Sequence, residues 1–289
     1  MKTQFRLLLA VGALALPGLV QAQSVGHYPA GAEGIKGASL PPTGVYLRDY
    51  NIGYFADDFP GGPPDFHAAG YVNAPRLIWM TPVQIIGATY GMDVIVPFGY
   101  KEVSVGAAKD NRFGLADIQI EPLLLAWHED QLDLALGYAV WAPTGDFDLM
   151  HPASLGQGFW THMLTFGGTY FFDSAKTWAL SLLGRYEFNM EQQYTHLTPG
   201  QDLTLEWGLS KGLSKTVDVG LIGYYQQQTT TDSGPGATNL KSRVVAAGPE
   251  INAVCPKLGI ITSLRYAREF AAEYRPEGNT FTLTLTKRF

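Results

Sequence analysis

The chain has 289 residues, of which 46% are hydrophobic and 16% charged, and its formal net charge is −6. Disordered chains carry more charge and fewer aromatic residues, and a single cysteine rules out a disulfide-stapled scaffold. The acidic balance leaves no basic footprint for nucleic acid, so nucleic acid is excluded as a partner.

Residues 1–22 have the parts of a secretory signal peptide. A positive n-region is followed by an apolar stretch over 7–16, and residues 20–22 end in the small-x-small pattern of a cleavage site. The alternative, a membrane anchor, is disfavoured because the apolar run is short and Pro17-Gly18 interrupts it. We therefore predict a bacterial protein exported through the Sec pathway, with the signal removed before Gln23.

Residues 23–43 are rich in glycine and proline and show little periodicity. Two interpretations stay open for this segment. It either enters the mouth of the downstream domain and narrows or gates it, or it is a flexible periplasmic tail.

From residue 44 onward the sequence alternates with period two, which is the pattern of half-buried strands. In the last segment, for example, Phe281, Leu283 and Leu285 alternate with threonines. No apolar run of about 18 residues, as a membrane-spanning helix requires, follows the N-terminus. Most of the strands instead have the roughly 9–11 residues that a tilted strand needs to cross a bilayer. The twelve predicted strands lie near 44–55, 71–81, 84–97, 114–128, 131–142, 159–172, 177–190, 200–211, 215–228, 241–254, 257–270 and 278–289.

The connections between these strands alternate in length. Long polar segments such as 55–67 and 142–158 follow the odd-numbered strands. Alternation of this kind is typical of an up-and-down barrel in the bacterial outer membrane, with short turns facing the periplasm. We therefore predict an all-β fold, a transmembrane antiparallel barrel of about twelve strands over residues 44–289. The tight turns that follow even-numbered strands are Pro82-Val83, Glu129-Asp130, 173–176, 212–215 and Cys255-Pro256.

The chain ends in Phe289, with apolar residues at alternate positions before it. This ending is similar to the C-terminal signal that the barrel-assembly machinery reads in outer-membrane proteins. The alternative is an ordinary edge strand that happens to end in phenylalanine. We interpret Phe289 as an assembly signal, and expect the barrel to contact outer-membrane lipid and lipopolysaccharide.

If the apolar rows face lipid, the opposite rows face the barrel interior. Those rows carry charged residues of both signs, which predicts a polar lumen. Each residue alone has an equally good structural interpretation, as half of an ion pair that holds the wall together, and side chains fill much of a small bore. The candidate lumen-lining residues are Arg76, Asp93, Asp117, Glu121, Asp133, Arg185, Glu187, Glu206, Glu250, Arg265 and Arg288.

The long segments carry apolar side chains that could form a landing site for hydrophobic solutes, although they could equally cap the barrel or anchor it at the headgroups. These candidate residues are Phe55, Phe59, Phe66, Phe147, Leu149 and Met150.

No catalytic or metal-binding pattern is found. The nearest match to a nucleophile–base pair is Thr195-His196, which has threonine where a serine nucleophile is needed. The six histidines are scattered without metal-ligand spacing. We predict no enzyme activity, no metal and no cofactor.

Several short motifs resemble a known family. They are 40–46, which leads into a strand with Arg48 and Tyr50, then 142–148, and 156–160 followed by 167–172. Together they resemble the outer-membrane family named for the MetA pathway of phenol degradation, across essentially the whole chain after the signal. Thr43 stands where a third proline is expected. The resemblance implies a barrel that passes hydrophobic aromatic compounds, and it supplies no catalytic or substrate-binding positions.

From the residues and the resemblance together we predict a channel for passive uptake of small hydrophobic or aromatic molecules. The alternative is a structural, adhesin-type or receptor-type outer-membrane barrel with a filled lumen. The two hypotheses differ in whether the barrel admits solute.

Overall fold

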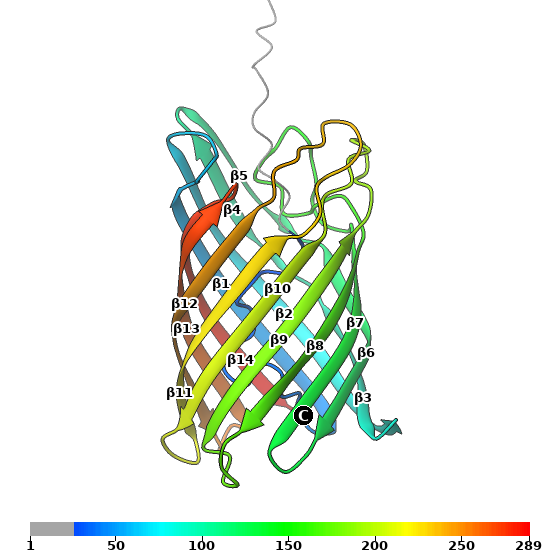
Figure 1. The fold of residues 1–289 in the computed structure, drawn as a ribbon, viewed down its shortest axis with the longest axis vertical. Coiled ribbons are helices and arrows are strands. Elements are labelled where there is room, and N and C mark those ends of the chain that lie inside the picture. Colours follow the sequence, from blue (N-terminus) through cyan, green and yellow to red (C-terminus); the bar gives the residue numbers. More distant parts are fainter. Residues whose placement is uncertain (1–25) are drawn as a thin grey trace, which may run out of the picture.

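The computed structural model describes residues 26–289, and within them the regular elements are all β-strands (Figure 1). The predicted signal peptide and residues 23–25 lie outside the described part. No helix in that part is long and apolar enough to cross a membrane. The strands are β1 (Gly44–Asp58), β2 (Phe66–Ile85), β3 (Ala88–Ile95), β4 (Phe98–Val105), β5 (Ala108–Leu115), β6 (Ile118–His128), β7 (Leu132–Ala142), β8 (Thr161–Phe171), β9 (Trp178–Asn189), β10 (Asp202–Gly212), β11 (Val217–Gln228), β12 (Arg243–Cys255), β13 (Ile260–Glu273) and β14 (Glu277–Arg288).

Twelve of these strands form a closed antiparallel barrel. Neighbours along the chain pair with one another, and β1 pairs with both β2 and β14, which closes the ring. Closure leaves no strand edge within the wall, as a bilayer requires. The predicted twelve-stranded barrel is confirmed.

The two remaining strands correct one expectation. Residues 98–113 were expected to be a long polar loop, but they form most of the hairpin β4–β5, which pairs with the Phe66–Asn73 half of β2. The high charge density of this stretch hides its alternation. Its charges pair across the hairpin, where Lys109 Nζ lies 2.7 Å from Glu102 Oε1, while Tyr100 and Phe113 face each other on the outer side.

The turn between β2 and β3 also differs from the expectation. Pro82-Val83 was predicted as the turn, but the chain turns at Ile86-Gly87, where both residues have positive φ (46° and 80°). This geometry suits a two-residue hairpin. Pro82 lies where the β2–β3 register shifts, between Met80 and Gln84, because proline cannot donate to the ladder.

Short turns gather at one end of the barrel, which we call the turn end, and long segments at the other, the loop end (Figure 1). The C-terminus lies at the turn end. Along the strands, outward positions such as Leu283 and Leu285 are exposed, whereas the alternate inward positions Thr282 and Thr284 are buried.

Residues 26–43 lie inside this barrel, and we call them the luminal segment (Figure 1). At the loop end, Gln157 Nε2 donates to the carbonyl of Gly26 (3.4 Å). At the turn end, Thr43 Oγ1 donates to the carbonyl of Thr81 (3.4 Å) and the Thr43 carbonyl accepts from Arg288 (2.9 Å). The segment thus runs the length of the bore before the chain turns into β1.

Candidate functional site: the filled bore

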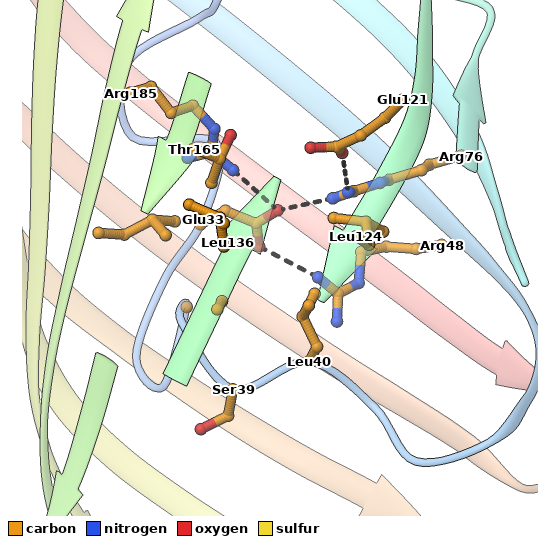
Figure 2. Close-up of a pocket in the computed structure, with 13 residues that line it drawn as sticks. Glu33, Ser39, Leu40, Arg48, Arg76, Glu121, Leu124, Leu136, Thr165 and Arg185 are labelled. Carbon is orange, nitrogen blue, oxygen red and sulfur yellow. Dashed lines mark hydrogen bonds and ion pairs between the residues drawn. The ribbon is translucent and has the colours of Figure 1, made fainter. Parts of the chain in front are cut away.

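The central contact of the luminal segment is the carboxylate of Glu33 (Figure 2). It accepts hydrogen bonds from Arg48 and Arg76 (both 3.1 Å) and from the Tyr50 hydroxyl (2.8 Å). A third guanidinium, that of Arg185, lies 3.9 Å away. Glu33 is 9% exposed, so three cations from three strands converge on one buried carboxylate. Charge-assisted bonds of this kind are about twice as strong as neutral ones.

Arg76 extends this contact into a network on the wall. Its guanidinium donates to Asp93 of β3 and to Glu121 of β6 (3.0 Å) as well as to Glu33. Buried charges are stable when each is paired and hydrogen-bonded. Because β2, β3 and β6 are neighbours in the barrel, Arg76 joins three wall strands to the segment inside.

A second contact lies toward the loop end, at Tyr28. The Tyr28 hydroxyl donates to Glu206 Oε2 (2.8 Å), and the Arg185 guanidinium lies over the Tyr28 ring, 4.0 Å from its centre. Arg185 also donates to Glu206 (2.7 Å), as does the backbone N–H of Gly31 (2.7 Å). Glu206 therefore fixes a side chain and the backbone of the luminal segment together.

The loop end of the segment is held by His27. Its Nε2 lies 2.9 Å from Asp117 Oδ2 and its Nδ1 lies 2.9 Å from Thr161 Oγ1. Thr161 Oγ1 in turn donates to Asn189 Oδ1 (2.7 Å). His27 therefore connects the loop end of the luminal segment to two buried side chains, Asp117 and Thr161.

Asp117 also orders the long segment outside. It accepts from the backbone N–H groups of Gly145 (2.8 Å) and Gln157 (2.7 Å). One carboxylate therefore links the luminal segment to the connection between β7 and β8. Trp141, stacked 5.6 Å from His27, covers this junction.

At the turn end the segment is held through its backbone. The N–H of Ile35 donates to Glu250 Oε2 (2.8 Å), and the N–H of Ala38 donates to Ser181 Oγ (3.1 Å). Lys36 Nζ lies 2.9 Å from Asp218. A Cβ on Gly34 would collide with the Glu250 carboxylate, which explains why glycine occurs where backbone and wall meet this closely.

Little room is left around the segment. One cavity, beside Glu33 and Arg76, has a volume of about 20 Å³ (Figure 2). Another, beside Arg265 and Asn252, has about 70 Å³. A water needs about 10–15 Å³ by this measure. The first cavity is therefore about the size of one water molecule, and the second is about the size of a few. In the described chain the bore is filled.

The sequence-predicted lumen residues are placed as follows. Arg288 is exposed at the turn end, where it donates to Thr43. The other candidates are buried on the inner face: Arg76, Asp93, Asp117, Glu121, Asp133, Arg185, Glu187, Glu206, Glu250 and Arg265. Their charges are used largely to hold the luminal segment and one another, instead of lining open water.

The residues that organise the bore were missed by sequence reasoning. His27, Tyr28 and Glu33 come from a stretch without periodicity, and Arg48 and Tyr50 were noted only as part of a family motif. One signal was available, since Glu33 is the only acidic residue between 23 and 43.

The candidate landing-site residues do not form one cluster. Phe55 faces outward on β1 and contacts Phe281. Phe59 and Phe66 pack edge to face, 5.1 Å apart, and are buried. Phe147, Leu149 and Met150 remain together at the loop end.

The Phe147 ring stacks on Tyr194, with centroids 6.5 Å apart, and this contact joins two long segments. Leu149 and Met150, two and three residues further along the chain, are 50% and 83% exposed. A landing site for solutes at these residues stays a prediction.

Phe289 is exposed at the turn end, and its N–H donates to the Val45 carbonyl (2.9 Å). Its role in assembly stays a prediction. His196 contacts Glu191 on the surface, and within residues 26–289 no three His, Cys, Asp or Glu side chains are arranged to hold a metal.

Residues 48–285 match the family described as "Putative MetA-pathway of phenol degradation". The chain belongs to this family. No curated protein sequence gives a significant match.

Solved structures agree with the family assignment at the level of the fold. The COG4313 outer membrane channel from Pseudomonas putida F1 is similar with a TM-score of 0.76 and 16% identity, over 87% of this chain and 97% of that one. The translocator domain of autotransporter NalP from Neisseria meningitidis has a TM-score of 0.52 and 11% identity, over 88% and 91%. This family member is therefore an outer-membrane β-barrel, and by the usual orientation of such barrels its turn end faces the periplasm.

Proposed function

We propose that this protein is a channel for the passive passage of small hydrophobic or aromatic compounds across the outer membrane, without catalysis. Membership of a family named for phenol degradation and similarity to an outer-membrane channel support a solute-conducting role. Flux down a concentration gradient requires no energy source.

The observation that carries the proposal is the filled bore. Spaces of about 20 and 70 Å³ are too small for either a sugar or an aromatic molecule. Passage of any such solute therefore requires the luminal segment to shift, against the hydrogen bonds and ion pairs that hold it. Slow, selective passage suits sparingly soluble molecules better than bulk nutrients.

The loop-end surface supports the hydrophobic class of solute. Leu149, Met150 and Tyr194 are exposed on segments at the loop end, and Tyr194 stacks on the partly buried ring of Phe147. Exposed apolar patches on soluble loops mark interaction sites.

The same filled bore favours one alternative, a structural barrel whose lumen never opens. We test the two by uptake of radiolabelled ethylbenzene and of a small sugar in cells with and without the protein. A channel of the proposed kind gives selective loss of ethylbenzene uptake on deletion. Equal loss of both solutes indicates a general porin, and no loss of either indicates the structural role.

A further inference from the structure

A polar cluster lies on the outer face of the barrel wall, where lipid is the solvent. Asn51 and Asn73 each donate to a different oxygen of the Asp49 carboxylate (both 2.9 Å). Asn73 also donates to Asn51 Oδ1 (3.1 Å), and the Tyr71 hydroxyl donates to the same oxygen (2.6 Å). We call Asp49, Asn51, Tyr71 and Asn73 the outer polar cluster.

The register of the strands places this cluster on the lipid side. Asp49 and Asn51 alternate along β1 with Arg48 and Tyr50. The side chains of Arg48 and Tyr50 point inward and contact Glu33 inside the bore. Successive side chains of a strand point to opposite faces. The cluster therefore faces away from the lumen.

The neighbours of the cluster place it within the apolar belt. On β14, Leu285 lies opposite Asp49 and Leu283 lies opposite Asn51. On the turn-end side, Leu47 and Leu77 form the adjacent outward pair. These four leucines are 37–49% exposed, as expected of side chains that face acyl chains.

A carboxylate in this position is costly, and acidic side chains at membrane depth are functional candidates for that reason. No described lysine, arginine or histidine forms an ion pair with Asp49. Its two hydrogen-bond partners, Asn51 and Asn73, are neutral amides, which use two of roughly four acceptor sites. The hydroxyl of Tyr71 and the amide groups of Asn51 and Asn73 all donate hydrogen bonds to other members of the cluster. The cluster can therefore accept a further hydrogen bond from a bound molecule.

Aromatic side chains flank the cluster on its loop-end side. Tyr71 lies opposite Tyr100, which lies opposite Phe113, so three rings form one cross-strand row. Phe98 lies opposite Asn73. All four rings are at least 37% exposed. A hydrogen-bond acceptor beside exposed aromatic rings suits a molecule in which an aromatic ring carries one hydrogen-bond donor.

We propose that the outer polar cluster is a binding site for hydroxyl-bearing aromatic molecules dissolved in the outer membrane. The hydroxyl donates to Asp49, and the ring packs against Tyr71 and its aromatic neighbours. A hydroxyl–carboxylate bond is charge-assisted and is strengthened where water is absent. This inference rests on the proposed function and narrows its substrate class.

A second copy of the chain is a poorer occupant. A two-fold contact centred here would bring the two Asp49 carboxylates together, and like charges in apolar surroundings repel strongly. Lipid phosphates carry the same sign of charge as Asp49. The cluster therefore disfavours anionic occupants.

The test compares 4-ethylphenol with ethylbenzene, which differ only by the hydroxyl. Asp49, Asn51 and Asn73 are replaced together by leucine, which removes the carboxylate and both amides and keeps the Tyr71 ring. Leu285→Ala, which alters the adjacent lipid-facing side chain but no hydrogen bond, is the matched control. Heat-modifiable mobility on gels verifies that each variant is a folded barrel.

Direct binding is read with a phenol that carries a photoreactive diazirine, added to proteoliposomes and mapped by peptide mass spectrometry. We expect crosslinks in β1 and β2 that 4-ethylphenol suppresses at roughly tenfold lower concentration than ethylbenzene, since one charge-assisted bond is worth about that factor. The triple variant loses this preference and the control keeps it. Labelling spread evenly over the lipid-facing strands, or equal competition by both compounds, overturns the proposal.

Uptake separates this inference from the proposed function. Loss of the 4-ethylphenol preference with ethylbenzene uptake intact in the triple variant supports both. Unchanged preference in that variant refutes the binding site alone. Cells that lack the protein could take up both compounds at the wild-type rate while the purified protein is still crosslinked in β1 and β2. That result refutes the channel function and supports the binding site.

Discussion

The Glu33 carboxylate and the Arg76 guanidinium meet at 3.1 Å inside the barrel, and this contact joins the luminal segment to the wall. Arg76 reaches Glu33 from a position 43 residues later in the chain. The luminal segment is thus held in the bore in part by buried charge pairs with the strands.

Replacement of Glu33 by glutamine is expected to free the luminal segment. The three surrounding guanidinium groups lose their common counter-charge, and breaking a buried pair from one side costs about 3–5 kcal/mol. Single-channel conductance in planar bilayers should rise, with more frequent openings. Glu191→Gln, at an exposed acid on a loop-end segment, should leave conductance unaltered; equal behaviour of the two variants would contradict the prediction.

Tyr28→Phe removes one hydroxyl and keeps the ring beneath Arg185. The lost hydrogen bond to the Glu206 carboxylate is worth about 1.5–3 kcal/mol. We expect a smaller increase in open probability than for Glu33→Gln, with the barrel still fully folded. Tyr194→Phe, on an exposed ring, serves as the control. An open probability identical to wild type would show that Glu206 does not hold the segment through this hydroxyl.

Gly34→Ala should loosen the luminal segment, because its Cβ displaces the Glu250 carboxylate and so breaks the hydrogen bond that this carboxylate accepts from the Ile35 N–H. In a chain whose exposed Cys255 is replaced by serine, a cysteine introduced at Ala38 should then react faster with a water-soluble maleimide than it does when Gly34 is retained. Gly53→Ala is the matched control, since a Cβ there meets only ordinary contacts, at 3.9 Å and beyond. Equal labelling rates with and without the Gly34→Ala substitution would show that the luminal segment is not packed tightly against Glu250.

The hairpin β4–β5 holds the long β7–β8 connection through Asp110. Burial would raise the pKa of this carboxyl, but hydrogen bonds from His151 and from the N–H of Ala153 outweigh burial and lower the pKa below its usual value. A depressed pKa in the folded state stabilises the contact at pH values above the unfolded value of about 3.9. This stabilisation is lost as the pH falls through the lower, folded pKa.

We therefore expect proteolysis of residues 143–158 on intact cells to accelerate as the medium is acidified below about pH 4. The assay uses a protease that is active in acid. Asp110→Asn should already be cleaved quickly at neutral pH and show a flatter dependence. A wild-type rate independent of pH would count against this link.

The strands were predictable because each carries its own local pattern. Leu283 and Leu285 alternate with buried threonines, and this period alone identifies β14 and its lipid face. The β4–β5 hairpin was not predicted because its charged residues, such as Lys109 and Glu102, hide the alternation and pair with each other only once the hairpin has formed.

The luminal segment could not be placed from sequence for a different reason. Its partners are distant in the chain, as with Tyr28 and Glu206, which are 178 residues apart. Contacts of that kind follow from complementarity between segment and wall, which leaves no periodic trace in the residues 26–43. The charged residues of the wall follow the alternation of their strands, but nothing in that pattern indicates that they contact residues 26–43.

The luminal segment and the wall that surrounds it belong to the same polypeptide. Within residues 26–289 they are covalently continuous only at Thr43-Gly44, at the turn end. All the other contacts between them are noncovalent, so a substitution that breaks the contacts of Glu33 leaves the segment attached to its own barrel. Each barrel is therefore synthesised together with its own filling, in a fixed ratio of one to one.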